Sequence, residues 1–228
     1  ATVHYRQGDS DEDRTAYGEV VLAAIGRVPN TDADWFRSSG LKLDERGYVT
    51  VDGYGRTNLD GVWALGDITP GHALAHRAFE QGITIAEKIA GADPKPVIDD
   101  TVPQVVFSFP EAASVGLTLD QAKAREDVVE PKETAYPMLS NARMLMSGEG
   151  GSMTVVSGAF ANNPDMQVVL GVHIVSPIAS DLIAEAEQLV GNRVPLADAA
   201  RLIHPHPTFS ETLGEALLKA DGRPLHTR

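Results

Sequence analysis

The chain has 228 residues, of which 43% are hydrophobic and 22% are charged, and this composition excludes disordered and fibrous proteins and favours a globular one with a buried core. The formal net charge of -13 argues against a nucleic-acid partner, and no apolar run is long enough to predict contact with a membrane. The sequence has no cysteine, and its seven histidines lack metal-ligand spacing, so neither disulfides, thiol nucleophiles nor a metal site are expected.

The N-terminal residues predict two strands, at 2–6 and 16–25, joined by a polar turn. The second strand ends in a near-continuous apolar run, which is typical of a strand buried on both faces. Because a hairpin alone is marginal in water, we expect these strands to be the end of a domain that begins before Ala1.

The next stretch predicts a short helix at 34–38, an apolar strand at 62–67 and a longer helix at 73–90. Asp67 would lie at the carboxyl end of a buried strand, where open α/β sheets bind ligands. The alternative is that Asp67 caps the following turn.

A domain boundary is predicted at 92–100, which is rich in proline and charge. Beyond it the elements predict an α+β layer, in which a sheet has helices on one side. The strands are expected at 104–107, 133–137, 152–157 and 168–175, with a hairpin turn at 161–165, and the helices at 119–125, opened by a capping box, 178–190 and 196–201.

The segment 204–211 combines two histidines with two prolines, a serine and a glutamate. Ser210 is predicted as the N-cap of a helix over 212–218, with Glu211 beside it. The Glu211 carboxylate could accept a proton from one nitrogen of His206, which would fix the tautomer and raise the basicity of the other nitrogen. The alternative is an ordinary turn histidine and a glutamate that complements the helix dipole, and the spacing alone leaves both open.

Five segments in this order resemble the C-terminal half of the pyridine nucleotide-disulfide oxidoreductases, and they lie at 21–30, 57–67, 74–76, 102–118 and 204–211. The resemblance implies that Asp67 holds a ribityl hydroxyl of FAD and that the backbone around Ala75 lies against the flavin ring. It also implies that His206 is the acid-base group and that Glu211 orients it, with His204 as a weaker candidate.

The fold implied is α/β plus α+β. Residues 1–25 would end an NAD-binding domain, 26–98 would form the second FAD-binding segment, and 99–228 would form an interface (dimerisation) domain with an antiparallel sheet covered by helices. In this family the histidine serves the disulfide of the opposite subunit, so a homodimer is expected. The contact is expected on an apolar stripe that could equally be core, namely Ile178, Leu182, Ile183 and Leu189.

Within the family, the segments are most similar to dihydrolipoamide dehydrogenases, which implies oxidation of dihydrolipoamide by NAD+ through FAD. Mycothione, mercuric and quinone reductases are the alternatives. The implied partner is the lipoyl-bearing acyltransferase of 2-oxoacid dehydrogenase complexes, and the implied location is cytoplasmic.

Two parts of the family pattern are missing from the sequence, namely the redox cysteines and the glycine-rich dinucleotide turns. We therefore expect a fragment that is inactive by itself and holds no stable FAD. An oligomerisation module without chemistry is the alternative. A hydrolase built on His206 and Glu211 ranks lower, because no Gly-x-Ser-x-Gly elbow is present.

Overall fold

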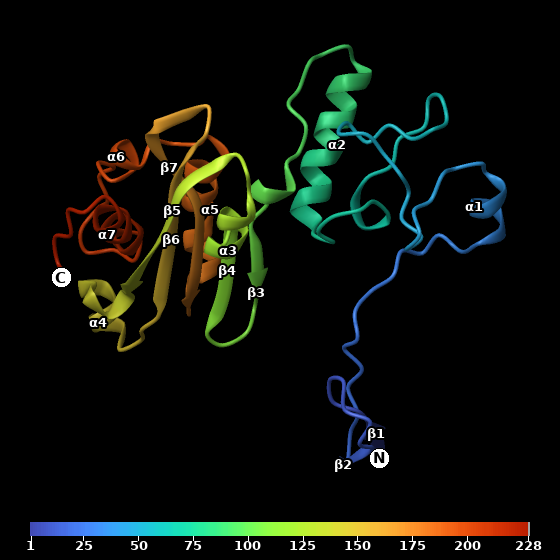
Figure 1. Ribbon diagram of the computed structural model, residues 1–228, viewed down its shortest axis with the longest axis horizontal. Coiled ribbons are helices and arrows are strands. Elements are labelled where there is room, and N and C mark those ends of the chain that lie inside the picture. The colour runs from blue at the N-terminus through green and yellow to red at the C-terminus, as the bar shows by residue number, and fades with distance from the viewer. Residues whose placement is uncertain (228) are drawn as a thin grey trace.

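The computed structural model describes residues 1–227, which form three successive parts. A two-stranded hairpin comes first, a loop-rich segment with one long helix follows, and a five-stranded sheet with its helices makes up the second half (Figure 1).

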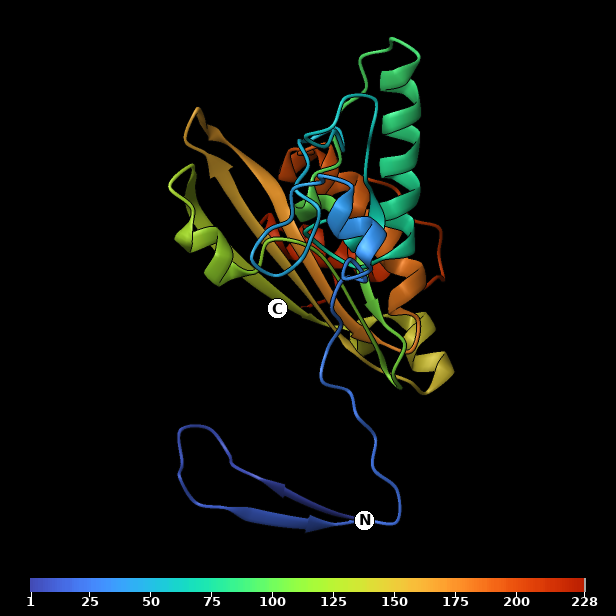
Figure 2. The same cartoon turned by 90° about the vertical axis from the view of Figure 1, so that its right-hand side faces the viewer.

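The hairpin consists of β1 (Thr2–Tyr5) and β2 (Arg14–Tyr17), which pair antiparallel. Figure 2 shows that it stands apart from the rest of the molecule at the end of an extended segment. The strand predicted over 16–25 ends at Tyr17, and the prediction that it is buried is wrong, because Tyr17 is 82%, Val20 85% and Ile25 97% exposed. An apolar strand needs neighbouring strands and a covering layer, and no part of residues 1–227 supplies them here.

The loop-rich segment contains the predicted helix α1 (Asp34–Ser38) and a small core of Phe36, Val49 and Ala64. The predicted strand at 62–67 is wrong, because this stretch makes an isolated bridge and then the 3-10 turn η1 (Gly66–Ile68). Gly61 and Gly66 both have φ near +72°, so the extended stretch between them is too short for a ladder.

Helix α2 (Ala75–Ile89) confirms the predicted helix. Two of its side chains bond to the linker that follows it. The buried Arg77 donates from Nε to Oδ1 of Asp99 at 2.6 Å, and the ring Nε2 of His76 lies 2.7 Å from the carbonyl oxygen of Pro103. Asp99 belongs to the short turn η2 (Asp99–Thr101). Helix α2 is therefore tied to the chain that enters the sheet.

All strands of the sheet pair antiparallel, in the order β3-β4-β7-β6-β5. Strand β4 was not predicted from the sequence. Its alanines and serine favour strands weakly, and pairing on both sides by β3 and β7 holds it extended. The strands are β3 (Gln104–Val106), β4 (Glu111–Gly116), β5 (Val128–Pro137), β6 (Ser152–Phe160) and β7 (Asn163–Ser176).

The helices cover mainly one face of this sheet, as predicted. Helix α5 packs on β4 and β7, and α7 packs on β5 and β6. The short helix α3, with the predicted capping box, packs beside β5 in a second cluster on the other face. The helices are α3 (Leu119–Ala124), α4 (Ala142–Ser147), α5 (Ala179–Gly191), α6 (Leu196–Ala199) and α7 (Glu211–Ala220), and the turn η3 (Met138–Ser140) precedes α4.

The apolar stripe of α5 belongs to the main core. Leu182, Ile183 and Leu189 are buried there, and Ile178 packs against the same cluster. The expectation that this stripe makes the subunit contact is wrong, because the inner face of the sheet already covers it. Within residues 1–227, no helix is both long and apolar enough to cross a bilayer.

Candidate active site: a histidine-glutamate pair before helix α7

His206 and Glu211 meet at the junction between an irregular loop and α7. The ring Nδ1 of His206 lies 2.8 Å from Oε1 of Glu211, and the backbone N–H of Thr208 donates to Oε2 of the same carboxylate at 2.8 Å. Both oxygens of Glu211 are therefore engaged, one by the histidine and one by the loop that carries it.

The two side chains differ in exposure and therefore in what they can do. The side chain of His206 is 70% exposed, whereas that of Glu211 is 19% exposed. Burial raises the pKa of Glu211, but the hydrogen bonds from the Thr208 amide and the His206 ring outweigh it and hold the pKa below the usual 4.5. An ionised carboxylate only accepts, so Nδ1 of His206 carries a hydrogen, and in the neutral imidazole Nε2 is the nitrogen with the free lone pair. Nε2 has no hydrogen-bond partner among residues 1–227.

Thr208 holds the conformation of the loop through its hydroxyl, and the sequence did not predict this role. Its hydroxyl donates to the carbonyl oxygen of Pro205 at 2.6 Å and lies 2.9 Å from the hydroxyl of Ser210. Ser210 occupies the N-cap position of α7, but its side chain makes no capping bond in the described structure, so that detail of the prediction is wrong. Its backbone already has helical angles, and the hydroxyl bonds to Thr208 instead.

The start of α4 also contacts the loop, through Asn141 and Arg143. Asn141, which is 6% exposed, donates from Nδ2 to the carbonyl oxygen of Thr208 at 3.1 Å. The guanidinium of Arg143 lies 5.4 Å from the ring centroid of Phe209, within the range of a cation-π contact. The only local signal for Asn141 was its suitability as a helix N-cap, because its contact with Thr208 spans 67 residues.

His204 is placed differently from His206. Its Nε2 lies 2.8 Å from Oε1 of Glu185 on α5, and its side chain is 9% exposed. The hydrogen bond with Glu185 raises the pKa of His204, against the opposing effect of burial. The ring lies so close to α7 that a Cβ at Gly214 would be 2.6 Å from its Nδ1. His204 is therefore a packed neighbour of α5 and α7 with little access to solvent.

Tyr136 lies in the core beneath α7 and is fully buried. Burial, followed by the nearby charges of Glu215 and Glu211, raises its pKa to about 12. Its phenol therefore stays protonated at ordinary pH and supplies no base. Glu215 instead accepts from the backbone N–H of His226 and lies 2.8 Å from its ring Nδ1.

The predicted flavin contacts lie in the other part of the molecule. Asp67 in η1 has a side chain that is 55% exposed, with Oδ2 3.7 Å from Nη1 of Arg27. Ala75 is the exposed first residue of α2, and no described side chain caps this helix end. A half-exposed carboxylate acceptor and an uncapped helix start fit a hydroxyl-bearing cofactor. Figure 1 places this region and α7 at opposite sides of the sheet domain, so the chain does not bring the two sites together.

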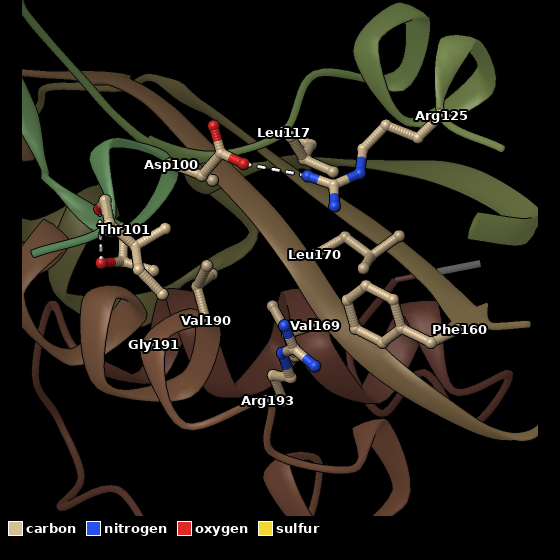
Figure 3. A pocket seen from close by; sticks show the side chains of 12 residues that line it. Asp100, Thr101, Leu117, Arg125, Phe160, Val169, Leu170, Val190, Gly191 and Arg193 are labelled. Carbon is tan, nitrogen blue, oxygen red and sulfur yellow. Dashed lines mark hydrogen bonds and ion pairs between the residues drawn. The ribbon is translucent and has the colours of Figure 1, made fainter. Parts of the chain in front are cut away.

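Two hollows lie outside both sites. A cavity of about 130 Å³ lies between η2, the end of β4 and the end of α5, with the guanidinium groups of Arg125 and Arg193 at its wall (Figure 3). Arg125 is already bound to Asp100 at 3.0 Å and to Asp127 at 2.8 Å, and Arg193 lies over the Phe160 ring. A larger hollow of about 780 Å³ lies between α2, the linker and α5. The part of the chain that the structure describes contains no cluster of three side chains suited to a metal ion.

Two family models match the chain. The model described as pyridine nucleotide-disulphide oxidoreductase, dimerisation domain, matches residues 102–217, and the one described as pyridine nucleotide-disulphide oxidoreductase matches residues 3–82.

Curated relatives match almost the whole chain. A dihydrolipoyl dehydrogenase from Cupriavidus necator is 40% identical over 99% of this chain and 46% of its own length. One from Geobacillus stearothermophilus is 39% identical over 94% of this chain and 44% of its own length. The chain thus spans about half the length of the curated relatives it matches.

Solved structures have the same fold. LpdA from Mycobacterium tuberculosis is 30% identical with a TM-score of 0.81, over 95% of this chain and 47% of that one. The flavoprotein disulfide reductase RclA from Escherichia coli, at 23% identity and a TM-score of 0.73 over 91% of this chain and 48% of that one, supports the fold alone.

Proposed function

Because the chain belongs to the pyridine nucleotide-disulphide oxidoreductases, we propose that it supplies the C-terminal half of a dihydrolipoyl dehydrogenase, with His206 and Glu211 as its acid-base pair. The observation that carries this proposal is the contact of 2.8 Å between Nδ1 of His206 and the partly buried Glu211 carboxylate, on a histidine whose side chain is 70% exposed.

The proposed reaction oxidises dihydrolipoamide with NAD+ to lipoamide, NADH and a proton. The dithiol must react as a thiolate, so a base has to remove a thiol proton first. Nε2 of His206 takes that proton, and Glu211 stabilises the imidazolium that results, because its carboxylate lies against Nδ1. On the return of the proton to solvent, the same contact restores the starting tautomer.

Asp67 and the start of α2 are the residues that would hold FAD. Asp67 offers an accessible carboxylate to a hydroxyl, and the exposed Ala75 would let a flat ring approach the backbone. Bound FAD would supply the electron transfer between the dithiol and NAD+. We expect the chain alone to hold no stable flavin, because its sequence lacks a glycine-rich turn for the pyrophosphate.

The match of residues 102–217 to a dimerisation domain favours a homodimer, in which each site takes its histidine from the opposite subunit. The lipoyl-bearing acyltransferase and the cytoplasmic location expected from the sequence are part of the same proposal. A pure oligomerisation module is the second candidate, favoured by that same match.

Substitution of His206 by Gln in the intact flavoenzyme tests the proposal. Loss of a general base should lower kcat for dihydrolipoamide oxidation by about 10²- to 10⁴-fold. Electron transfer from NADH to an artificial acceptor should not change, because that reaction removes no thiol proton. An unchanged rate with dihydrolipoamide would remove His206 from the mechanism.

A further inference from the structure

Asn141 uses both halves of its side-chain amide within the fold. Its Oδ1 accepts the backbone N–H of Met144 at 3.1 Å and so caps α4, while its Nδ2 donates to the carbonyl oxygen of Thr208 at 3.1 Å. The side chain is nearly excluded from solvent, at 6% exposure. The asparagine amide supplies the acceptor and the donor on two separate atoms, so one side chain can bond to both elements.

Thr208 connects that amide to the catalytic pair. Its carbonyl oxygen accepts from Asn141, and its own N–H donates to Oε2 of Glu211 at 2.8 Å. The other oxygen of Glu211 lies 2.8 Å from Nδ1 of His206. A continuous row of hydrogen bonds therefore runs from the start of α4 to the exposed imidazole.

These hydrogen bonds connect the start of α4 to the loop before α7, and the two lie 67 positions apart in the sequence. Thr208 lies in a loop without regular structure, whereas Asn141 is fixed by the first turn of α4 and by its own burial. The hydroxyl bonds of Thr208, to Pro205 and Ser210, stay within the loop and cannot anchor it to the sheet domain. Arg143 approaches the next residue, Phe209, but a cation-π contact tolerates more sliding than an amide-carbonyl bond.

We propose that Asn141 is a positioning residue of the acid-base pair, acting through the backbone of Thr208 to set where Glu211 holds His206. This inference rests on the proposed function of the pair. General-base catalysis needs the base within hydrogen-bond reach of the proton, so a loosened loop slows the reaction although no catalytic group is lost.

Three substitutions separate the positioning role from the capping role. Asn141→Ser and Asn141→Asp keep a good N-cap acceptor for α4 but remove the amide that donates to Thr208, since the serine hydroxyl is shorter and the aspartate only accepts, whereas Asn141→Ala removes both the acceptor and the donor. In the intact flavoenzyme, both variants should keep the flavin content of the wild type, and Asn141→Ser should melt closer to the wild type than Asn141→Asp, which places a carboxylate at a 6% exposed position against the Thr208 carbonyl oxygen. Their kcat with dihydrolipoamide should fall by about 10- to 100-fold with little change in KM. Asn141→Ala should show the same fall in kcat together with a lower melting temperature.

The controls make the inference falsifiable. Asn162→Ser, at the exposed turn between β6 and β7, should leave every parameter unchanged. Electron transfer from NADH to an artificial acceptor should be normal in Asn141→Ser, since it removes no thiol proton. Wild-type kcat in both Asn141→Ser and Asn141→Asp would overturn the inference, as would an equal loss of both reactions, which would indicate a general structural defect.

His206→Gln, measured beside these variants, distinguishes failure of the positioning role of Asn141 from failure of the acid-base role of His206. If His206→Gln is slow and Asn141→Ser is not, only the positioning role fails. If His206→Gln is as fast as the wild type, the acid-base pair itself fails and there is nothing for Asn141 to position.

Discussion

Among the three histidine-glutamate pairs within residues 1–227, all at 2.8 Å, those of His204 and His206 differ most in the exposure of the histidine. His206 is 70% exposed on its side chain, whereas His204 is 9% exposed and bonded to α5. Exchange of a proton with a substrate requires an accessible nitrogen, so exposure rather than bond length separates the catalytic candidate from the structural one.

The raised pKa of His204 gives a prediction about stability. A histidine whose pKa is higher in the folded protein than the usual 6.5 stabilises the fold fully below that value, and the contribution is lost as the pH rises through the folded pKa. Glu185→Gln removes the main cause of the shift. It should therefore lower the melting temperature more at about pH 6 than at about pH 9.

Two measurements check this prediction. Thermal melts of wild type and Glu185→Gln at the two pH values give the stability difference, and NMR titration of the His204 ring gives its pKa directly. A pKa that does not fall in Glu185→Gln, or an equal loss of stability at both pH values, would contradict the account.

The spacing of five positions between His206 and Glu211 allowed their contact and left an ordinary turn histidine open, and it was the family resemblance that favoured the pair. The sequence did not predict Asn141, whose contact with Thr208 spans 67 residues and depends on how α4 packs. Local spacing can indicate a dyad, but the supporting contacts come from tertiary structure and leave no periodic signal.

At the scale of elements, two of the errors have one cause, which is tertiary pairing. Strand β4 has a weak local preference and forms because β3 and β7 flank it. The run at 20–25 has a strong preference and no partner, so it remains an exposed extended segment. Helices α2 and α5, whose apolar residues follow a clear helical period, were predicted to within a few residues.

The linker between α2 and the sheet contains two adjacent aspartates, Asp99 and Asp100. Each forms an ion pair with an arginine of a different part of the fold. Asp99 binds Arg77 of α2, and Asp100 binds Arg125 at the end of α3. Asp99→Ala would leave the 5% exposed Arg77 as a buried charge without its partner. Because Asp99 itself is 41% exposed on its side chain, the loss should be about 2 to 4 kcal/mol in the free energy of unfolding.

Urea unfolding of the variant measures this loss. Asp93→Ala is a matched control, because Asp93 also binds a cation of α2, Lys88, but its side chain is 91% exposed. The control should unfold at nearly the wild-type urea concentration. Equal midpoints for the wild type and Asp99→Ala would show that Arg77 finds another partner.

At the scale of the whole molecule, the family predicted from five segments is confirmed by both family models. The order of those segments along the chain carried the prediction, because each segment alone is short and weakly specific. The mixed fold was also predicted, with an antiparallel sheet covered by helices. The domain boundaries near residues 25 and 98 stay predictions, as do the roles of Asp67 and Ala75.

We expect this chain to form a dimer in solution, and we expect that dimer to show no turnover of dihydrolipoamide with NAD+. The match to a dimerisation domain covers 102–217, and those residues form a sheet with a complete core of their own. Since the stripe on α5 is buried in that core, the interface must use other surfaces. Turnover is not expected, because the sequence contains no cysteine to accept electrons from a dithiol.

Sedimentation at micromolar concentration tests the assembly, and NADH formation with dihydrolipoamide tests the turnover in the same sample. A dimer without turnover is the expected result. A monomer would contradict the assembly, and steady NADH formation without added protein would contradict the assignment of the chemistry to thiols outside this chain. Leu182→Ala separates core from interface, because the loss of a buried leucine should lower the melting temperature and leave the dimer intact.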